Sequence, residues 1–183
     1  MPKNRIRISG GVWRSRLISF PPRPDLRPTP DRVRVTLFNW LGQDLSGRRC
    51  LDLFAGSGAL GFEAASRGAV RVVLVEKDLA AFRALEANAR RLDSPALELR
   101  RDDALEFLRL DSERYDVVFV DPPFRAEVLP RVLEALIPRL AAQALVHVEA
   151  PHPPTLTPQW EVWRSSRAGQ VNHQLLKWTG HDA

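Results

Sequence analysis

A glycine-rich turn and an acidic residue lie where two neighbouring strands are expected to end. Phe54-Ala55-Gly56-Ser57-Gly58 joins an expected buried strand (residues 48–54) to an expected helix (residues 57–68), and Glu76 ends the next expected strand, 20 residues after Gly56. Glycines let a ligand approach the backbone without a Cβ clash, and a helix start offers free N–H groups. A carboxylate at this spacing can accept hydrogen bonds from both hydroxyls of a ribose. The pattern predicts a site for a nucleoside-containing cofactor; the simpler alternative is a tight turn with a surface glutamate.

A second motif, Asp121-Pro122-Pro123-Phe124, directly follows the expected strand YDVVFV. Proline has no N–H, so backbone carbonyls in this corner are free to accept hydrogen bonds. Asp121 adds a carboxylate acceptor, and Phe124 adds a flat apolar face. An exocyclic amine of a nucleic-acid base needs acceptors for its N–H groups, and its ring needs a stacking partner. We expect the corner to hold a base whose amino group reacts; a plain proline turn at a strand end is the alternative.

The glycine turn alone does not decide which nucleoside cofactor binds. Residues 56–61 read GSGALG, which also satisfies the dinucleotide fingerprint. A nicotinamide-dependent dehydrogenase is therefore an alternative. That alternative explains neither the proline corner nor the charge of the N-terminal segment.

Positive charge is concentrated at the N-terminus. Residues 1–34 hold nine Lys or Arg and two Asp, a net charge of +7, against −2 for the remainder. Alternation of basic with small or apolar residues over 5–20, around Gly10-Gly11, predicts a basic β-hairpin followed by a proline-rich linker. Such an arm suits a polyanion, and a merely solvated surface is the alternative. The candidates for phosphate contacts are Arg5, Arg7, Arg14, Arg16 and Arg27, with Trp13 placed to stack on a base.

The elements that must position these residues alternate between strand and helix from residue 48 onward. Strands are expected at residues 48–54, 71–76, 96–100, 115–120 and 144–150, with helices at 57–68, 79–92, 104–110 and 128–141 between them. This order predicts an α/β fold with a mainly parallel sheet covered on both faces. Residues 159–178 predict a terminal antiparallel hairpin, and a helix capped by Asp31 is expected over 32–41.

Length and composition narrow the class of protein. The 183 residues suit one α/β domain, which we place at residues 31–183, with the arm at 1–30. A hydrophobic fraction of 44% is enough for a core, and the single cysteine excludes an intramolecular disulfide. The four histidines do not have a metal-site spacing, and no apolar run approaches the length of a membrane helix. We expect a cytoplasmic monomer that holds no metal.

The two motifs together resemble Rossmann-like class I methyltransferases that depend on S-adenosylmethionine and carry an Asp/Asn-Pro-Pro-aromatic signature. The chain is most similar to the bacterial 16S ribosomal RNA guanine-N2 methyltransferases, which modify a loop in the head of the small ribosomal subunit. The shared segments cover nearly the whole chain: IRISGGVWRSR, LRPTPDRVRVTLFNWL, LDLFAGSGALGFEA, VDPPF and AGQV. The family commonly has Thr-Thr-Asp where this chain has Thr29-Pro30-Asp31, so the loop there lacks one donor.

The resemblance implies a role for each matching residue. Asp121, Pro122 and Phe124 would hold the target guanine, and the arm would bind 16S rRNA in the small subunit or an assembly intermediate. Glu76 would hold the ribose of S-adenosylmethionine, and Asp103 would accept from the adenine amino group, with Asp102 as the neighbouring alternative. The full implied cofactor set is Phe54, Ala55, Gly56, Ser57, Gly58, Glu76, Lys77, Asp103 and Ala104.

Two other functions remain open from the sequence. The first is an amino-methyltransferase acting on DNA adenine N6 or on a protein glutamine; such relatives often have Asn in place of Asp121. The second is an RNA-binding assembly factor that keeps the fold without turnover.

Overall fold

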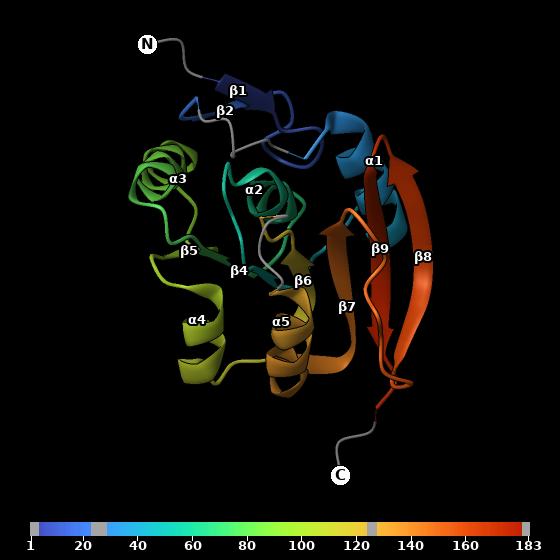
Figure 1. Cartoon of the computed structure of the whole chain (residues 1–183). Coiled ribbons are helices and arrows are strands. Elements are labelled where there is room, and N and C mark those ends of the chain that lie inside the picture. Colours follow the sequence, from blue (N-terminus) through green and yellow to red (C-terminus); the bar gives the residue numbers. More distant parts are fainter. Residues whose placement is uncertain (1–3, 23–28, 124–127, 181–183) are drawn as a thin grey trace.

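A seven-stranded sheet runs through the structure (Figure 1). The computed structural model describes residues 4–22, 29–123 and 128–180. The strands of the sheet are β3 (Arg49–Asp52), β4 (Arg71–Val75), β5 (Leu97–Arg100), β6 (Tyr115–Val120), β7 (Leu140–Ala150), β8 (Trp160–Ala168) and β9 (Val171–Trp178).

The strand order is β5-β4-β3-β6-β7-β9-β8. Neighbouring strands from β5 to β7 run parallel, whereas β9 is antiparallel to both β7 and β8. The parallel sheet and the terminal antiparallel hairpin predicted from the sequence are thus confirmed. Because β3 lies between β4 and β6, the loops that follow these three strands meet at one edge of the sheet.

Helices cover both faces of the sheet. They are α1 (Asp31–Leu41), α2 (Ala59–Ser66), α3 (Leu79–Leu92), α4 (Ala104–Leu110) and α5 (Leu129–Leu136). Apolar residues of α1, α2 and α3 pack with those of one sheet face, and those of α4 and α5 pack with those of the other. Strand residues alternate between the two cores, as a sheet buried on both faces requires: Leu51 and Val118 face α4 and α5, and Cys50 and Phe119 face the other helices.

Two element boundaries differ from the sequence expectation. The helix expected to reach residue 141 ends at Leu136, and Pro138 lies in a 3-10 turn at Ile137–Arg139. Proline cannot continue the α-helical hydrogen bonding, so β7 begins early, at Leu140. The expected capping role of Asp31 is also wrong: Pro30 occupies the N-cap position, and Asp31 is the first helical residue.

The N-terminal arm is a two-stranded hairpin of β1 (Asn4–Arg7) and β2 (Leu17–Phe20), as predicted. Its apolar side, with Ile8, Trp13 and Ile18, is buried in the same cluster as α2 and α3. Trp13 is only 7% exposed, so its ring is packed and has no open face for a nucleic-acid base. The expectation that Trp13 stacks on RNA is therefore corrected to a packing role.

A buried carboxylate on α2 fastens the arm to the body. Glu63 accepts hydrogen bonds from the backbone N–H groups of Ser9 (2.9 Å) and Gly10 (2.8 Å) and from the Ser9 hydroxyl (2.7 Å). Its charge is balanced by Arg67, at 2.7 Å, and both side chains are almost fully buried. Gly11 has a φ of +73°, and a Cβ there would lie 1.8 Å from the carbonyl oxygen of Ser66. The arm therefore sits at one position on α2.

We predict that Glu63→Gln lowers the free energy of unfolding by about 3–5 kcal/mol, because it leaves the buried Arg67 charge without its partner. Urea denaturation followed by circular dichroism measures this. The matched control is Glu106→Gln, which breaks an exposed pair with Arg109 on α4 and should cost less than about 1 kcal/mol. Equal losses in the two variants would contradict the fastening role of Glu63.

Candidate active site

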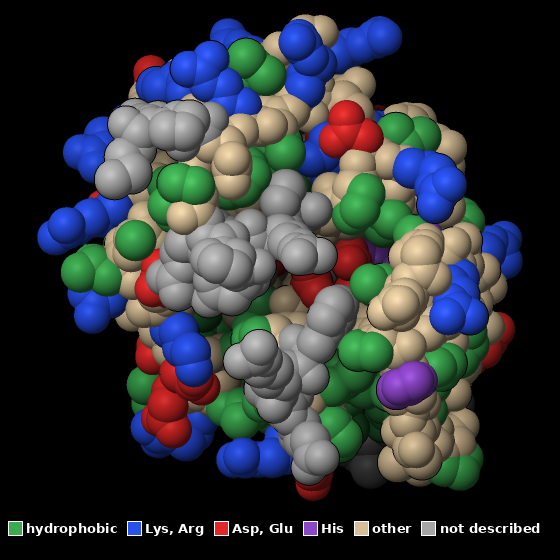
Figure 2. Space-filling view, turned by 45° about the horizontal axis from the view of Figure 1, so that its top comes forward, with side chains coloured by type: hydrophobic (Ala, Val, Ile, Leu, Met, Phe, Trp, Pro, Cys, Tyr) green, Lys and Arg blue, Asp and Glu red, His purple; other side chains and the backbone are tan. Residues whose placement is uncertain are grey.

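Four acidic side chains gather where β3, β4, β6 and β7 end. Asp52 is the last residue of β3, Glu76 and Asp121 directly follow β4 and β6, and Glu149 is the penultimate residue of β7. Figure 2 shows acidic side chains at the bottom of a hollow on this side of the molecule, with Lys and Arg side chains gathered over the N-terminal arm at its upper edge. An acidic floor under a basic rim is the main electrostatic feature of the site.

The glycine turn after β3 has the shape that the sequence predicts. Gly56 and Gly58 have φ values of +50° and +80°. A Cβ on Gly58 would lie 2.3 Å from the ring of Phe62, so only glycine fits at the start of α2. Asp52 accepts a hydrogen bond from the N–H of Gly61 at 3.0 Å. Asp52 therefore fastens the first turn of α2, directly after the glycine turn, to the end of β3.

Glu76 lies against this turn. One oxygen of its carboxylate accepts from the N–H of Gly56 at 2.9 Å, and the other accepts from the N–H of Asp78 at 2.7 Å. A carboxylate oxygen can accept more than one hydrogen bond. Glu76 is thus held in place by the backbone while keeping acceptor capacity for the two hydroxyls of a ribose.

The loop between β5 and α4 brings the remaining cofactor candidates to the same edge. Asp103 caps α4 by accepting from the N–H of Leu105 at 3.0 Å, and it lies 3.4 Å from the ammonium of Lys77. Asp102 accepts from the N–H of Asp103 at 2.8 Å. Ala104 is buried at the first position of α4. Both acids are therefore ordered by local backbone bonds, and either carboxylate keeps an acceptor site.

Asp121 lies at the end of β6, next to the glycine turn. The β3–β6 register pairs Asp52 with Phe119, so the residues that follow the two strands are neighbours across one strand spacing. Burial raises the pKa of Asp121 well above its usual range, and the charges of Glu149 and Asp52 raise it further. Pro122 is buried beside it. Phe124 lies outside the described residues, as does Arg27.

Glu149 belongs to the site, although the sequence reasoning did not single it out. It is 5% exposed and accepts a hydrogen bond from the Thr29 hydroxyl at 3.1 Å. Burial raises its pKa to about 7. His147 lies 3.9 Å away, but burial and the neighbouring His173 lower the His147 pKa to about 3, so it carries no compensating charge. The signal was present in the sequence: ALVHVEA is an apolar strand that ends with an acid, like RVVLVE and YDVVFVD.

The floor of the site carries carboxylates that the described residues do not neutralise. Among residues 4–22, 29–123 and 128–180, no Lys or Arg forms an ion pair with Asp52, Asp121 or Glu149. Burial raises the pKa of Asp52 as well, to about 7. Buried carboxylates without counter-charges suit a cationic ligand. S-adenosylmethionine carries a sulfonium cation and a ribose, so the residues present fit this cofactor.

The arginines of the arm that were expected to contact phosphates are accessible. Arg5, Arg7, Arg14 and Arg16 are all exposed, so their guanidinium groups can reach a polyanion. They lie on the hairpin, which packs against α2 and α3 (Figure 1). Within the described part of the chain, no helix is long and apolar enough to cross a membrane.

Comparison with known proteins gives the same picture. Residues 6–177 match the family model described as conserved hypothetical protein 95. The chain is 43% identical to ribosomal RNA small subunit methyltransferase D of Escherichia coli K12 over 178 residues, covering 94% of this chain and 90% of the relative. It is 38% identical to the protein of the same name from Haemophilus influenzae over 183 residues, covering 96% and 95% of the two chains.

Solved structures agree. A putative methyltransferase from Escherichia coli, yhhF, superposes with a TM-score of 0.88 at 42% identity, covering 97% of this chain and all of that one. An RNA methyltransferase from Salinibacter ruber, solved with S-adenosyl-L-homocysteine, shares the fold with a TM-score of 0.68 at 19% identity, covering 86% and 97%. The sequence is thus similar over nearly its whole length to the small subunit rRNA methyltransferases D. The chain belongs to the conserved hypothetical protein 95 family.

Proposed function

We propose that the protein transfers a methyl group from S-adenosylmethionine to the exocyclic N2 of a guanine in the rRNA of the small ribosomal subunit. The observation that carries this proposal is the parallel pairing of β3 with β6, which puts the glycine turn beside the Asp121-Pro122-Pro123 corner. A nucleoside cofactor and a base amine can then approach each other over one edge of the sheet. The relatives named as small subunit rRNA methyltransferases supply the class of substrate.

The chain's own residues would orient the cofactor. S-adenosylmethionine, when bound, supplies an electrophilic methyl group on a sulfonium. Glu76, held by the N–H of Gly56, would accept from its ribose hydroxyls, and the N-terminus of α2 would lie beside the glycine turn. The acids at the ends of β3, β6 and β7 would favour the cationic cofactor over its neutral product. Lys77, Asp103 and Ala104 would surround the adenine, with Asp103 the proposed acceptor from its amino group.

Asp121 and the Pro122 carbonyl would act on the target amine. A guanine amino group is a poor nucleophile because its nitrogen lone pair is delocalised into the ring. Acceptors on its N–H groups favour a more tetrahedral nitrogen with a directed lone pair, and alignment of the reacting atoms supplies further acceleration. The amine nitrogen would lose a proton as it gains the methyl group, and Asp121 would receive that proton. The base must leave its stack to reach this corner, which costs least in an unpaired loop.

The remaining proposals concern the partner and its recognition. The exposed arginines of the arm would contact rRNA phosphates, while Trp13 packs the arm against α2. We also propose that the protein acts as a monomer in the cytoplasm, where ribosomal subunits are assembled. A nicotinamide dehydrogenase is disfavoured because hydride transfer does not use the Asp-Pro-Pro corner, and because the relatives are named as methyltransferases.

The Asp121→Ala variant should lose methyl transfer by about 1,000-fold or more, because the amine loses its charged acceptor. Its affinity for S-adenosylhomocysteine should stay within about threefold of the unsubstituted protein. Transfer of labelled methyl groups to unmodified small subunits measures the first, and calorimetry the second. Asp116→Asn, at the opposite end of the same strand, is the control and should keep full transfer. Full activity in Asp121→Ala would exclude the assigned role.

Removing the ribose acceptor should affect binding first. Glu76→Ala is expected to weaken S-adenosylhomocysteine binding by roughly 10- to 100-fold, the effect of losing charge-assisted hydrogen bonds. Isothermal titration calorimetry measures the change, with Glu106→Ala on the exposed face of α4 as the control. Unchanged affinity in Glu76→Ala would show that the cofactor binds elsewhere.

Methyl transfer should rise as pH increases through about 7. The acceptors work as carboxylates. Burial raises the pKa of Glu149 to about 7, so Glu149 gains a proton as pH falls through that value. The pKa of Asp121 is also raised by burial, so Asp121 too loses acceptor strength as pH falls. Single-turnover rates at saturating cofactor, from pH 5.5 to 8.5, test this. Burial raises the pKa of Asp121 most, and the charge of Glu149 raises it further. Glu149→Gln removes that charge and should therefore move the midpoint to lower pH. A rate independent of pH in the unsubstituted protein would refute the prediction.

A further inference from the structure

Thr29 connects the start of α1 to the acidic floor, although it belongs neither to the cofactor residues nor to the proline corner. Its hydroxyl donates a hydrogen bond to a carboxylate oxygen of Glu149 at 3.1 Å. Both side chains are buried, with exposed fractions of 6% and 5%. Hydrogen bonds to an ionised group are stronger than those between neutral groups. The contact therefore favours the ionised form of Glu149.

The backbone around Thr29 holds its side chain in place for this contact. Thr29 precedes a proline, which restricts it to extended conformations, and Pro30 has a φ of −57° and a ψ of 147°. The carbonyl oxygen of Pro30 accepts the first hydrogen bond of α1, from the N–H of Arg34 at 3.0 Å. Thr29 is therefore joined directly to the end of a helix and keeps one direction relative to it.

Arg34 fastens the same end of α1 to the N-terminal arm. Its side chain is 1% exposed and donates to the carbonyl oxygen of Arg7, the last residue of β1, at 2.9 Å. It also donates to the carboxylate of Asp31 at 2.7 Å, which balances its charge. The arm, the start of α1 and the hydroxyl of Thr29 thus form one connected unit that ends on Glu149.

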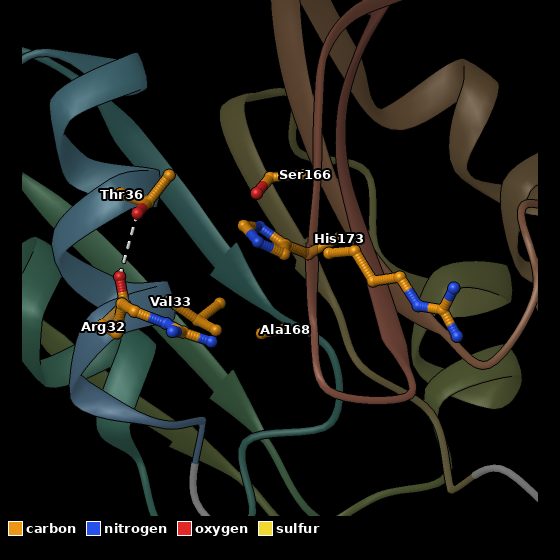
Figure 3. Close-up of a pocket in the computed structure, with 7 residues that line it drawn as sticks. Arg32, Val33, Thr36, Ser166, Ala168 and His173 are labelled. Carbon is orange, nitrogen blue, oxygen red and sulfur yellow. Dashed lines mark hydrogen bonds between the residues drawn. The ribbon is translucent and has the colours of Figure 1, made fainter.

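Glu149 has acidic and neutral neighbours on the strands packed around it. Asp121 lies beside it at the end of β6, and the charge of Asp52, at the end of β3, also acts on this cluster. His147 lies 3.9 Å away on the same strand, and His173 pairs with Glu149 from β9 and extends toward α1 (Figure 3). Burial lowers the pKa of both histidines, so neither is charged near pH 7. Among the described residues, no Lys or Arg therefore offsets the negative charge of Glu149 by an ion pair.

We propose that Thr29 is a positioning residue that keeps Glu149 ionised in the acidic floor, where this charge favours the cationic cofactor over its neutral product. The inference rests on the proposed function, because S-adenosylmethionine is the cation which that function supplies. Burial raises the pKa of Glu149 to about 7, and the hydrogen bond from Thr29 opposes this rise. Loss of the hydrogen bond would raise the pKa further and leave Glu149 mostly neutral at pH 7. A neutral Glu149 would no longer distinguish the charged cofactor from its uncharged product.

The test compares two ligands that differ in charge at the position of the methylated sulfur. Sinefungin carries an ammonium group there, and S-adenosylhomocysteine has a neutral thioether. Calorimetry from pH 5.5 to 8.5 gives the ratio of their dissociation constants, and in the unsubstituted protein the preference for sinefungin should rise through a midpoint at about 7 as Glu149 ionises. Thr29→Val keeps the shape of the side chain without its hydroxyl, and should move the midpoint upward by about one pH unit. Thr29→Ser keeps the hydroxyl and should restore the original midpoint.

Two controls separate this role from a general effect on α1. Thr36→Val removes a hydroxyl that donates to the carbonyl oxygen of Arg32 at 2.9 Å, a hydrogen bond within the helix (Figure 3), and should leave the midpoint in place. Thr29→Val in a Glu149→Gln background should cause no further change, because no carboxylate remains for the hydroxyl to stabilise.

The outcomes distinguish this proposal from the function on which it rests. An unshifted midpoint in Thr29→Val, an equal shift in Thr36→Val, or an additional change in the Glu149→Gln background overturns the positioning role of Thr29. Absence of methyl transfer to rRNA by a protein that shows the expected shifts overturns the proposed substrate and leaves the role of Thr29 intact. Failure of the unsubstituted protein to bind either ligand overturns both.

Discussion

The parallel pairing of β3 with β6 is the constraint on which the site depends. Strands that run parallel end at the same edge of a sheet, so the turn that follows β3 and the corner that follows β6 must meet there. A bond from the N–H of Leu53 to the carbonyl of Phe119, at 3.1 Å, continues this pairing beyond the last residue of β3. A slip of one residue would turn Asp52 and Phe119 to the opposite face. The apolar alternation of both strands, which fills two separate cores, makes such a slip costly.

The acidic floor is the second constraint, and it works against stability. Desolvation disfavours the ionised forms of Asp52, Asp121 and Glu149, and the described chain supplies no cation to offset this. The N–H of a glycine in α2 donates a hydrogen bond to Asp52, and the hydroxyl of Thr29 donates one to Glu149. These local hydrogen bonds stabilise carboxylates that burial alone would destabilise. A functional site can keep an arrangement that costs stability. Here the negative charges would attract the sulfonium of the cofactor and accept the proton that the target amine loses.

The sequence predicts the fold well because its signals are local. Strand and helix alternation, the glycine turn and the proline corner are each read from a few adjacent residues, and their positions agree with the structure. Glu149 was missed because an acid at the end of an apolar strand marks a candidate only, and its position beside Asp121 follows from the register of β7 with β6. Trp13 was misjudged for a similar reason: a tryptophan in a basic hairpin looks like a stacking residue until its contacts with α2 are known. Asp31 was displaced as a cap by Pro30, whose restricted φ already suits the start of a helix.

The hollow of the active site has acidic side chains at its bottom and basic side chains at its edge. This distribution of charge limits how an RNA strand can lie on the protein. Phosphates are repelled by the acids at the ends of β3, β6 and β7 and attracted by the exposed arginines of the arm. An RNA strand held by the arm therefore keeps its backbone at the basic rim and outside the hollow. The part of a nucleotide that can enter the acidic floor is then the uncharged base, whose amino group donates hydrogen bonds that the carboxylates can accept. The charge pattern thus selects the base for entry before any contact with Asp121 is made.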